Sequence, residues 1–283
     1  MLRIHVTGVG DAFTERYHNA SLCIEDVDSG LLLQVDCPPA FPRVLADYRQ
    51  RSGQDLRVER IDHLLLTHLH GDHCGGTEAY LYLRRFVVGR KPTLHGAKEV
   101  LDGLWSGRLR GGMERLLLSV PVWTEESLRD HSSRDAPASD DRRLLADPGG
   151  QVVELGLLDY TARQELLPGI THVGRLRIER RFTRHHIPTT ALRISLERPG
   201  APPRPLVSYS ADTAFDPDLI HWLSAADLII HETNFGVHTP LASLLLLPAE
   251  LRQRMRLIHY PDLLDPDTAP IRCLREGEVI ELG

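Results

Sequence analysis

One ten-residue stretch constrains this chain more than any other part of its sequence. It reads THLHGDHCGG at positions 67 to 76 and holds three histidines and an aspartate, namely His68, His70, Asp72 and His73. Crowding imidazoles beside a carboxylate costs solvation free energy unless a ligand binds them, and a divalent cation is such a ligand. The stretch therefore predicts a metal site, with further ligands to be found elsewhere in the chain.

The spacing of these four residues suits two cations rather than one. His68 and His70 alternate along extended chain, so their rings can point the same way, while Asp72 and His73 follow a glycine that lets the backbone turn. The first pair can then bind one cation and the second pair another. Two cations roughly 3.5–4 Å apart clamp attacking and leaving oxygens, which is hydrolytic chemistry. A histidine-rich surface loop is the alternative, and it leaves the motifs further along the chain unexplained.

The composition limits the classes of protein to which the chain can belong. A net charge of −6 over 283 residues argues against a basic protein that coats nucleic acid. The four cysteines form no CxxC pair, which suits a reducing compartment. The N-terminus has no signal-peptide pattern, and the apolar run at 241–247 is too short to span a bilayer. We expect a soluble cytoplasmic protein with no membrane association.

Hydrophobic patterns predict strands in both halves of the chain, with helices after several of them. The expected strands are 2–6, 21–27, 31–36, 61–68, 152–155, 160–167, 175–183, 191–196, 206–210 and 227–232. Helices are expected at 41–51 and 77–85, and residues 105–150, rich in Arg, Asp, Ser, Gly and Pro, are expected to form a helical insertion with a loop-like tip. This order favours an α+β fold, with two sheets face to face and helices outside, as a single domain over residues 1–283.

The segment HLHGDH resembles the signature of the metallo-β-lactamase superfamily, whose fold is an αββα sandwich of two mixed sheets. The resemblance implies three further ligands in a fixed order: a lone histidine, a bridging aspartate and a final histidine. The motifs FTRHHIPTTALRI, SYSADT and LIHYPD match that order and supply His185, Asp212 and His259. The resemblance to the family's His-x-x-Pro pattern favours His185 over the adjacent His186, although the sequence leaves that choice open.

The resemblance thus implies two divalent cations that share one aspartate. The first would be held by His68, His70, His185 and Asp212, and the second by Asp72, His73, Asp212 and His259. Ligands without a thiolate suit Zn²⁺, our expectation, but also Mn²⁺ or Fe²⁺. A helix cap at Asp212 and a buried strand-end histidine at His259 are the plain structural alternatives.

The segment DLIIHETNF at 227–235 resembles the HEAT motif of ribonuclease Z and related phosphodiesterases. We expect Glu232 to hold His231 in one tautomer while the ring faces the metals, so that both residues assist the leaving oxygen. Asp72 is expected to orient the attacking hydroxide. The alternative is that His231 is a strand-end histidine that is only capped by its neighbour and has no catalytic role. The segments 8–13 and 18–21 resemble the N-terminal hairpin of the same branch, in which an Asn approaches the site.

The resemblance implies a binuclear metal-dependent hydrolase, most like a phosphodiesterase acting on a small phosphodiester or nucleotide. A lactonase or thioesterase on the same metals and a non-catalytic ligand-binding protein are the alternatives. Only 27 positions separate His185 from Asp212, which leaves no room for the substrate-clamping arm of ribonuclease Z, so tRNA is not favoured as a substrate. The 105–150 insertion can be interpreted equally as a lid or a surface excursion, and the resemblance leaves a homodimer open.

Overall fold

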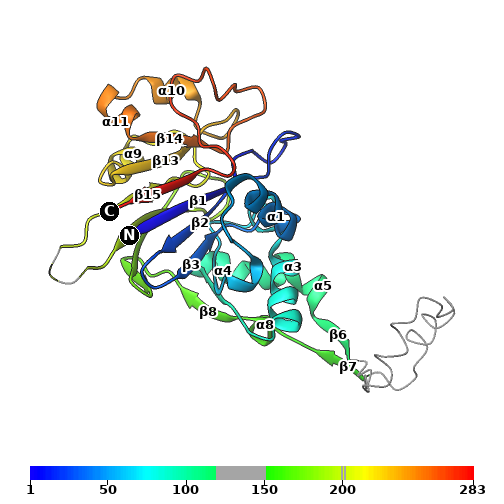
Figure 1. The fold of residues 1–283 in the computed structure, drawn as a ribbon. Coiled ribbons are helices and arrows are strands. Elements are labelled where there is room, and N and C mark those ends of the chain that lie inside the picture. Colours follow the sequence, from blue (N-terminus) through cyan, green and yellow to red (C-terminus); the bar gives the residue numbers. More distant parts are fainter. Residues whose placement is uncertain (119–150, 199, 201) are drawn as a thin grey trace.

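Two β-sheets pack face to face, and helices lie on the outside of both (Figure 1). The computed structural model describes residues 1–118, 151–198, 200 and 202–283. The predicted α+β sandwich, with two mixed sheets and helices outside, is confirmed.

The first sheet has seven strands and is formed mainly by the N-terminal half of the chain. In spatial order these are β15 (Val279–Leu282), β1 (Leu2–Gly8), β2 (Ser21–Asp26), β3 (Leu31–Val35), β4 (His63–Leu65), β5 (Thr93–Gly96) and β8 (Ala162–Glu165). Strands β1 to β3 are antiparallel, whereas β3, β4, β5 and β8 are parallel. The C-terminal ends of β3 and β4 therefore meet at one edge of the sandwich, and that of β2 lies at the opposite edge.

The second sheet has six strands. They are, in spatial order, β14 (Met255–Ile258), β13 (Leu228–Glu232), β12 (Val207–Tyr209), β11 (Thr190–Leu196), β10 (Leu176–Phe182) and β9 (Ile170–Val173). Strands β12, β13 and β14 are parallel to one another, so the residues that follow them gather at one edge of this sheet.

Amphipathic helices cover the outer faces. On the first sheet they are α1 (Phe41–Ser52), α3 (Thr77–Tyr82) and α4 (Lys98–Leu104), and beside the second lie α9 (Pro217–Leu223), α10 (Leu241–Leu245) and α11 (Ala249–Gln253) (Figure 1). Helix α1 begins with Pro42 in its first turn and ends at Gly53, whose φ of 71° provides a left-handed C-cap. Its buried residues Val44 and Leu45 pack in the same apolar cluster as Leu64 of β4.

The predicted insertion is partly described. Helix α5 (Arg110–Met113) follows a π-helical turn at Trp105–Leu109, and β6 (Arg115–Leu118) then pairs with β7 (Gln151–Glu154) as a two-stranded sheet apart from the sandwich (Figure 1). The expected loop-like tip, at 131–143, lies within 119–150, outside the described residues. The extent of the insertion, and its role as a lid, stay predictions.

Two predicted strands are shorter than expected. The run 61–68 is a strand only at His63–Leu65, after which the chain enters the ligand loop. The run 160–167 begins instead with the end of helix α8 (Leu157–Tyr160), and its strand is β8. The Tyr160 hydroxyl donates to the Met113 carbonyl 47 residues away, a tertiary contact that the local pattern does not contain.

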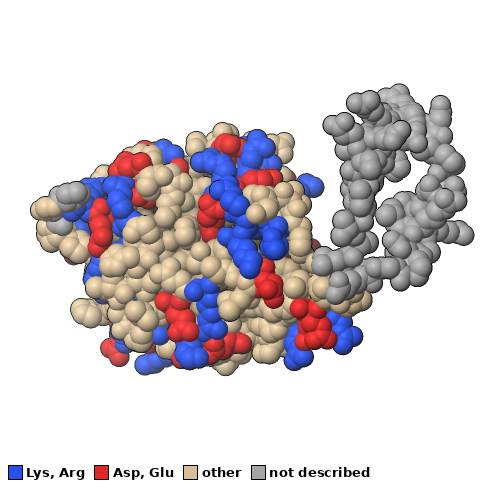
Figure 2. Space-filling view, turned by 90° about the horizontal axis from the view of Figure 1, so that it is seen from below, with Lys and Arg blue, Asp and Glu red and all other residues tan. Residues whose placement is uncertain are grey.

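The surface carries mixed charge. Basic and acidic side chains are interspersed on the face in Figure 2, where a group of basic side chains near the centre is bordered by acidic ones. Among the helices of the described residues, none is both long and apolar enough to cross a bilayer.

Candidate metal centre

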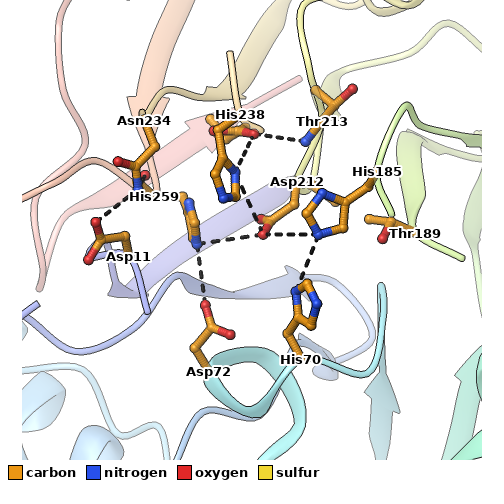
Figure 3. Close-up of polar contacts among 12 residues, drawn as sticks. Asp11, His70, Asp72, His185, Thr189, Asp212, Thr213, Asn234, His238 and His259 are labelled. Atoms are coloured by element: carbon orange, nitrogen blue, oxygen red, sulfur yellow. Dashed lines mark hydrogen bonds and ion pairs between the residues drawn. The ribbon is translucent and has the colours of Figure 1, made fainter. Parts of the chain in front are cut away.

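The predicted ligands converge where strands of both sheets end. The loop after β4 carries His68 and His70 and continues into the short helix α2 (Gly71–Cys74), while Asp212 follows β12 and His259 follows β14. Because these strand ends share one edge of the sandwich, residues almost 200 positions apart come within contact distance of each other (Figure 3).

The first group of side chains is His68, His70, His185 and Asp212, with one potential ligand atom from each lying within 4.8 Å of the others. Nδ1 of His70 lies 3.1 Å from Nε2 of His68 and 3.2 Å from Nε2 of His185. Oδ2 of Asp212 is 3.6 Å from the His68 nitrogen and 4.0 Å from that of His185. Three nitrogens and one oxygen therefore point at a common centre.

The second group is Asp72, His73 and His259, again within 4.8 Å of one another. Oδ2 of Asp72 lies 3.3 Å from Nε2 of both histidines. Oδ1 of Asp212 is 3.3 Å from the same His73 nitrogen, and its Oδ2 is 3.7 Å from that of His259. Asp212 therefore lies between the two groups and contacts both, as the sequence predicts.

Several of these atoms are buried without a hydrogen-bond partner. Nε2 of His73 and Oδ1 of Asp212 have no such partner among the described residues, and both side chains are almost completely buried. An unpaired buried polar atom costs free energy, which a cation bound to both atoms would recover. Imidazole nitrogens and carboxylate oxygens also match the donors that Zn²⁺, Mn²⁺ and Fe²⁺ accept. The residues therefore fit two divalent cations.

The electrostatics of the site favour added positive charge. Burial lowers the pKa of His259, yet the carboxylates of Asp212 and Asp72 raise it to about 9. Burial raises the pKa of Asp72, but His73 and His259 bring it well below its ordinary value. Burial, together with the neighbouring His73, keeps the pKa of His68 well below the ordinary value for histidine, so this imidazole is neutral and able to ligate.

Sequence reasoning missed the group that supports these ligands. Asp36, just past β3, is fully buried, and its Oδ2 accepts from Nδ1 of His73 at 2.9 Å. Its Oδ1 accepts from the Thr67 amide and hydroxyl, and that hydroxyl lies 3.0 Å from Nδ1 of His68. Asp36 thus orients His73 directly and His68 through Thr67, turning Nε2 of both toward the centre. The sequence feature that could have identified this residue is the position of Asp36 at the end of the apolar run 31–36.

Unusual backbone conformations also gather here. Four non-glycine residues of the described chain have positive φ, and three of them are at the centre: Asp36 at 62°, Ala211 at 48° and His259 at 53°. Such conformations persist where the surrounding structure enforces them, often at functional sites. Gly76 also closes the ligand loop tightly, since a β-carbon there would collide with the Pro38 carbonyl.

The predicted pairing of His231 with Glu232 is wrong. Neighbours on a strand point to opposite faces, so the Glu232 carboxylate reaches the centre while His231 turns away, its Nδ1 2.6 Å from the Glu232 carbonyl. His238 takes the expected place, because its Nδ1 lies 2.9 Å from Oε1 of Glu232 and 3.9 Å from Oδ2 of Asp212 (Figure 3). The same Oε1 accepts from the Thr213 amide. Alternation along the strand could have excluded His231, but no local pattern identified His238.

The N-terminal hairpin reaches the centre, as the resemblance implies. Asn234 donates to Oδ2 of Asp11 at 2.8 Å (Figure 3). Asn19 donates to the Asp11 carbonyl. The Tyr260 amide donates to the Val9 carbonyl, next to ligand His259. The hairpin therefore fixes the loops after β13 and β14 rather than contributing a ligand of its own.

Comparisons with known proteins agree with this geometry. The profile of the family described as Anti-Pycsar protein Apyc1 matches residues 2–128 and 153–278. The chain belongs to the Anti-Pycsar protein Apyc1 family. An Apyc1 protein of Paenibacillus sp. (strain J14) is 30% identical over 293 residues, covering 99% of both chains. One from Saccharibacillus brassicae is 32% identical over 268 residues, covering 92% of this chain and 90% of that relative.

The solved structures show the fold of this Apyc1-family chain. The metallo-β-lactamase fold protein YhfI from Bacillus subtilis superposes with a TM-score of 0.65 at 17% identity, covering 100% of this chain and 99% of YhfI. The Apyc1-family chain therefore has the metallo-β-lactamase fold.

Proposed function

We propose that this chain is a phosphodiesterase that hydrolyses a cyclic nucleotide at a centre of two divalent cations, most simply Zn²⁺. The carrying observation is that Asp212 contacts both groups of potential ligands, while His238, paired with Glu232, lies 3.9 Å from the same carboxylate. The family name Anti-Pycsar supports a cyclic nucleotide as the substrate class.

When bound, the two cations would supply Lewis acidity and generate a nucleophile from water near neutral pH. His68, His70, His185 and Asp212 would hold the first, and Asp72, His73, Asp212 and His259 the second. Within the second group, Oδ2 of Asp72 lies 3.3 Å from Nε2 of both His73 and His259, and its carboxylate would also orient the attacking water.

His238 and Glu232 are placed to deliver a proton. Nδ1 of His238 donates to Glu232, and although burial lowers the pKa of His238, this carboxylate raises it and so favours the imidazolium form. In that form Nε2 carries a second proton, which would be given to the leaving oxygen. The His238 side chain is 18% exposed, whereas Glu232 is fully buried, so substrate can reach the first and not the second. Glu232 therefore acts through His238, and His231 has no role at the reacting atoms.

An apolar pocket adjoins the centre and suits a nucleobase. It has a volume of about 290 Å³ and is lined by Thr233, Asn234, Phe235, Pro240, Leu241 and Pro261, among others. Thr233 follows Glu232 directly, and Pro261 lies two residues after His259, so the pocket is formed by the segments that follow Glu232 and His259. The Phe235 side chain is 66% exposed, as a stacking surface for a base requires.

The test is an assay of the purified full-length chain loaded with Zn²⁺ or Mn²⁺. Cyclic mononucleotides, bis-p-nitrophenyl phosphate, a lactone, a thioester and a tRNA precursor with a 3′ trailer would be compared. We expect ring opening of a cyclic nucleotide to show the highest kcat/KM. Activity on the lactone or thioester without any on the phosphodiesters would overturn the proposal, as would a loaded chain that turns over none of these compounds.

A further inference from the structure

His70 presents its two ring nitrogens to different partners. Nδ1 faces the centre, 3.1 Å from Nε2 of His68 and 3.2 Å from Nε2 of His185. Nε2 faces away and lies 2.9 Å from Nε2 of His186, the histidine that follows His185 in the chain. His186 is exposed and is not part of either ligand group.

These distances define where the protons lie. A neutral imidazole that ligates through Nδ1 carries its hydrogen on Nε2, and that N–H needs an acceptor. Nε2 of His186 can accept it when the proton of His186 is on Nδ1. The bond between the two rings therefore runs from His70 to His186, and it fixes His70 in the tautomer that a cation at the first group requires.

His186 completes a pattern that the other two loop histidines already show. Nδ1 of His68 meets the Thr67 hydroxyl, and Nδ1 of His73 meets Asp36, so each has a partner behind the nitrogen that faces the centre. Both of those partners are buried, and they lie just past β3 and β4 of the first sheet. His70 instead finds its partner 116 positions away, on the loop between β10 and β11.

We propose that His186 is a positioning residue for His70 and raises the affinity of the first cation. This inference rests on the proposed metal centre, although not on the identity of the substrate. Outer partners of ligating histidines typically change metal affinity by about 10- to 100-fold when removed. The dipeptide His185-His186 would then supply one ligand and the support of another, linking the two halves of the chain through one cation.

The experiment measures metal affinity rather than turnover. Full-length wild type, His186→Ala and His186→Gln are stripped with a chelator and titrated with Zn²⁺ against a chromophoric competitor. His221→Ala, at an exposed histidine on α9, is the matched control. Repeating the titrations in a His259→Ala background, which removes a ligand of the second group only, isolates the first site.

We expect two ions per wild-type chain and a first-site affinity about 10- to 100-fold weaker in His186→Ala. The Gln side chain offers an acceptor oxygen, so His186→Gln should recover most of that loss, and His221→Ala should match wild type. Normal wild-type binding together with unchanged affinity in His186→Ala would overturn the inference alone. The inference would also be overturned if His186→Gln bound the first cation as weakly as His186→Ala does. A wild-type chain that binds no Zn²⁺ would instead overturn the proposed function, and this inference with it.

Discussion

Buried acidic side chains lie at both edges of the sandwich, and they are neutralised in different ways. At the edge away from the centre, Asp26 at the end of β2 is bound by Arg175, whose Nε donates to it at 2.8 Å, and by the Ser29 hydroxyl. At the centre, Asp72, Asp212 and Glu232 are contacted by imidazoles, and within the described residues no arginine or lysine forms an ion pair with them.

This difference separates a structural ion pair from a binding site. A guanidinium satisfies both oxygens of Asp26, so nothing else is required there. Imidazoles are weaker and titratable partners, and Oδ1 of Asp212 has no hydrogen-bond partner among the described residues. The acids at the centre therefore attract cations, whereas Asp26 contributes to the fold. Four predictions follow from this contrast, in order of decreasing effect.

Asp212→Ala should have the largest effect. Loss of the shared carboxylate should lower kcat/KM by at least roughly 10³-fold and leave fewer than two metal ions per chain. In wild type, metal at 100 times its Kd should stabilise the fold by about 2.7 kcal/mol, and the variant should lose most of this. Elemental analysis and thermal unfolding with and without Zn²⁺ measure both. Two ions per chain in the variant would contradict the account of a shared aspartate.

His238→Ala and His231→Ala form a matched pair, because His231 lies in β13 and His238 on the loop that follows this strand. We expect His238→Ala to lower kcat by about 10²- to 10³-fold with unchanged metal content, because only the proton donor is lost. His231→Ala should keep kcat within a few-fold while destabilising the fold by roughly 1–3 kcal/mol, since its ring is buried away from the centre. Steady-state kinetics and urea unfolding distinguish the two. If His231→Ala lowered kcat more than His238→Ala does, His231 rather than His238 would be the proton donor.

Asp26→Ala should act on stability alone. Removing a buried carboxylate that accepts from Arg175 and Ser29 should cost roughly 2 kcal/mol of unfolding free energy. Metal stoichiometry and kcat/KM of the folded variant should equal those of wild type, because this aspartate lies at the opposite edge. A change in metal content would show that the two edges are coupled.

The smallest effect is the dependence of this stability on pH. Burial raises the pKa of Asp26, but Arg175 and Ser29 lower it below its ordinary value of 3.8. A carboxyl with a lowered pKa in the folded state stabilises the fold above its unfolded pKa, and this contribution is lost as pH falls through the folded pKa. The difference in urea midpoint between wild type and Asp26→Ala should therefore be constant at pH 5–7 and shrink below about pH 4. If the difference in urea midpoint stayed constant down to pH 3, the ionised Asp26 carboxylate would not be the source of this stability.

The fold could be predicted because its signals are local. Alternation and apolar runs indicate the strands, and the HxHxDH spacing with three later motifs matches a known superfamily. Strand ends were less accurate, since contacts such as Tyr160 with Met113 decide where a strand begins. In the centre, the seven predicted ligands come together, whereas Asp36, His238 and the role of His186 were not predicted.

The motifs already define which nitrogens and oxygens the centre offers and in what order, because the ligand types and their spacing along a loop are properties of the sequence. Only the tertiary structure decided their partners. It assigned Glu232 to His238 instead of His231, because side-chain direction alternates along a strand while the loop that returns His238 has no sequence signature. It also placed Asp36 behind His73 and His186 behind His70, because hydrogen bonds between residues 37 and 116 positions apart depend on how the strands and loops pack.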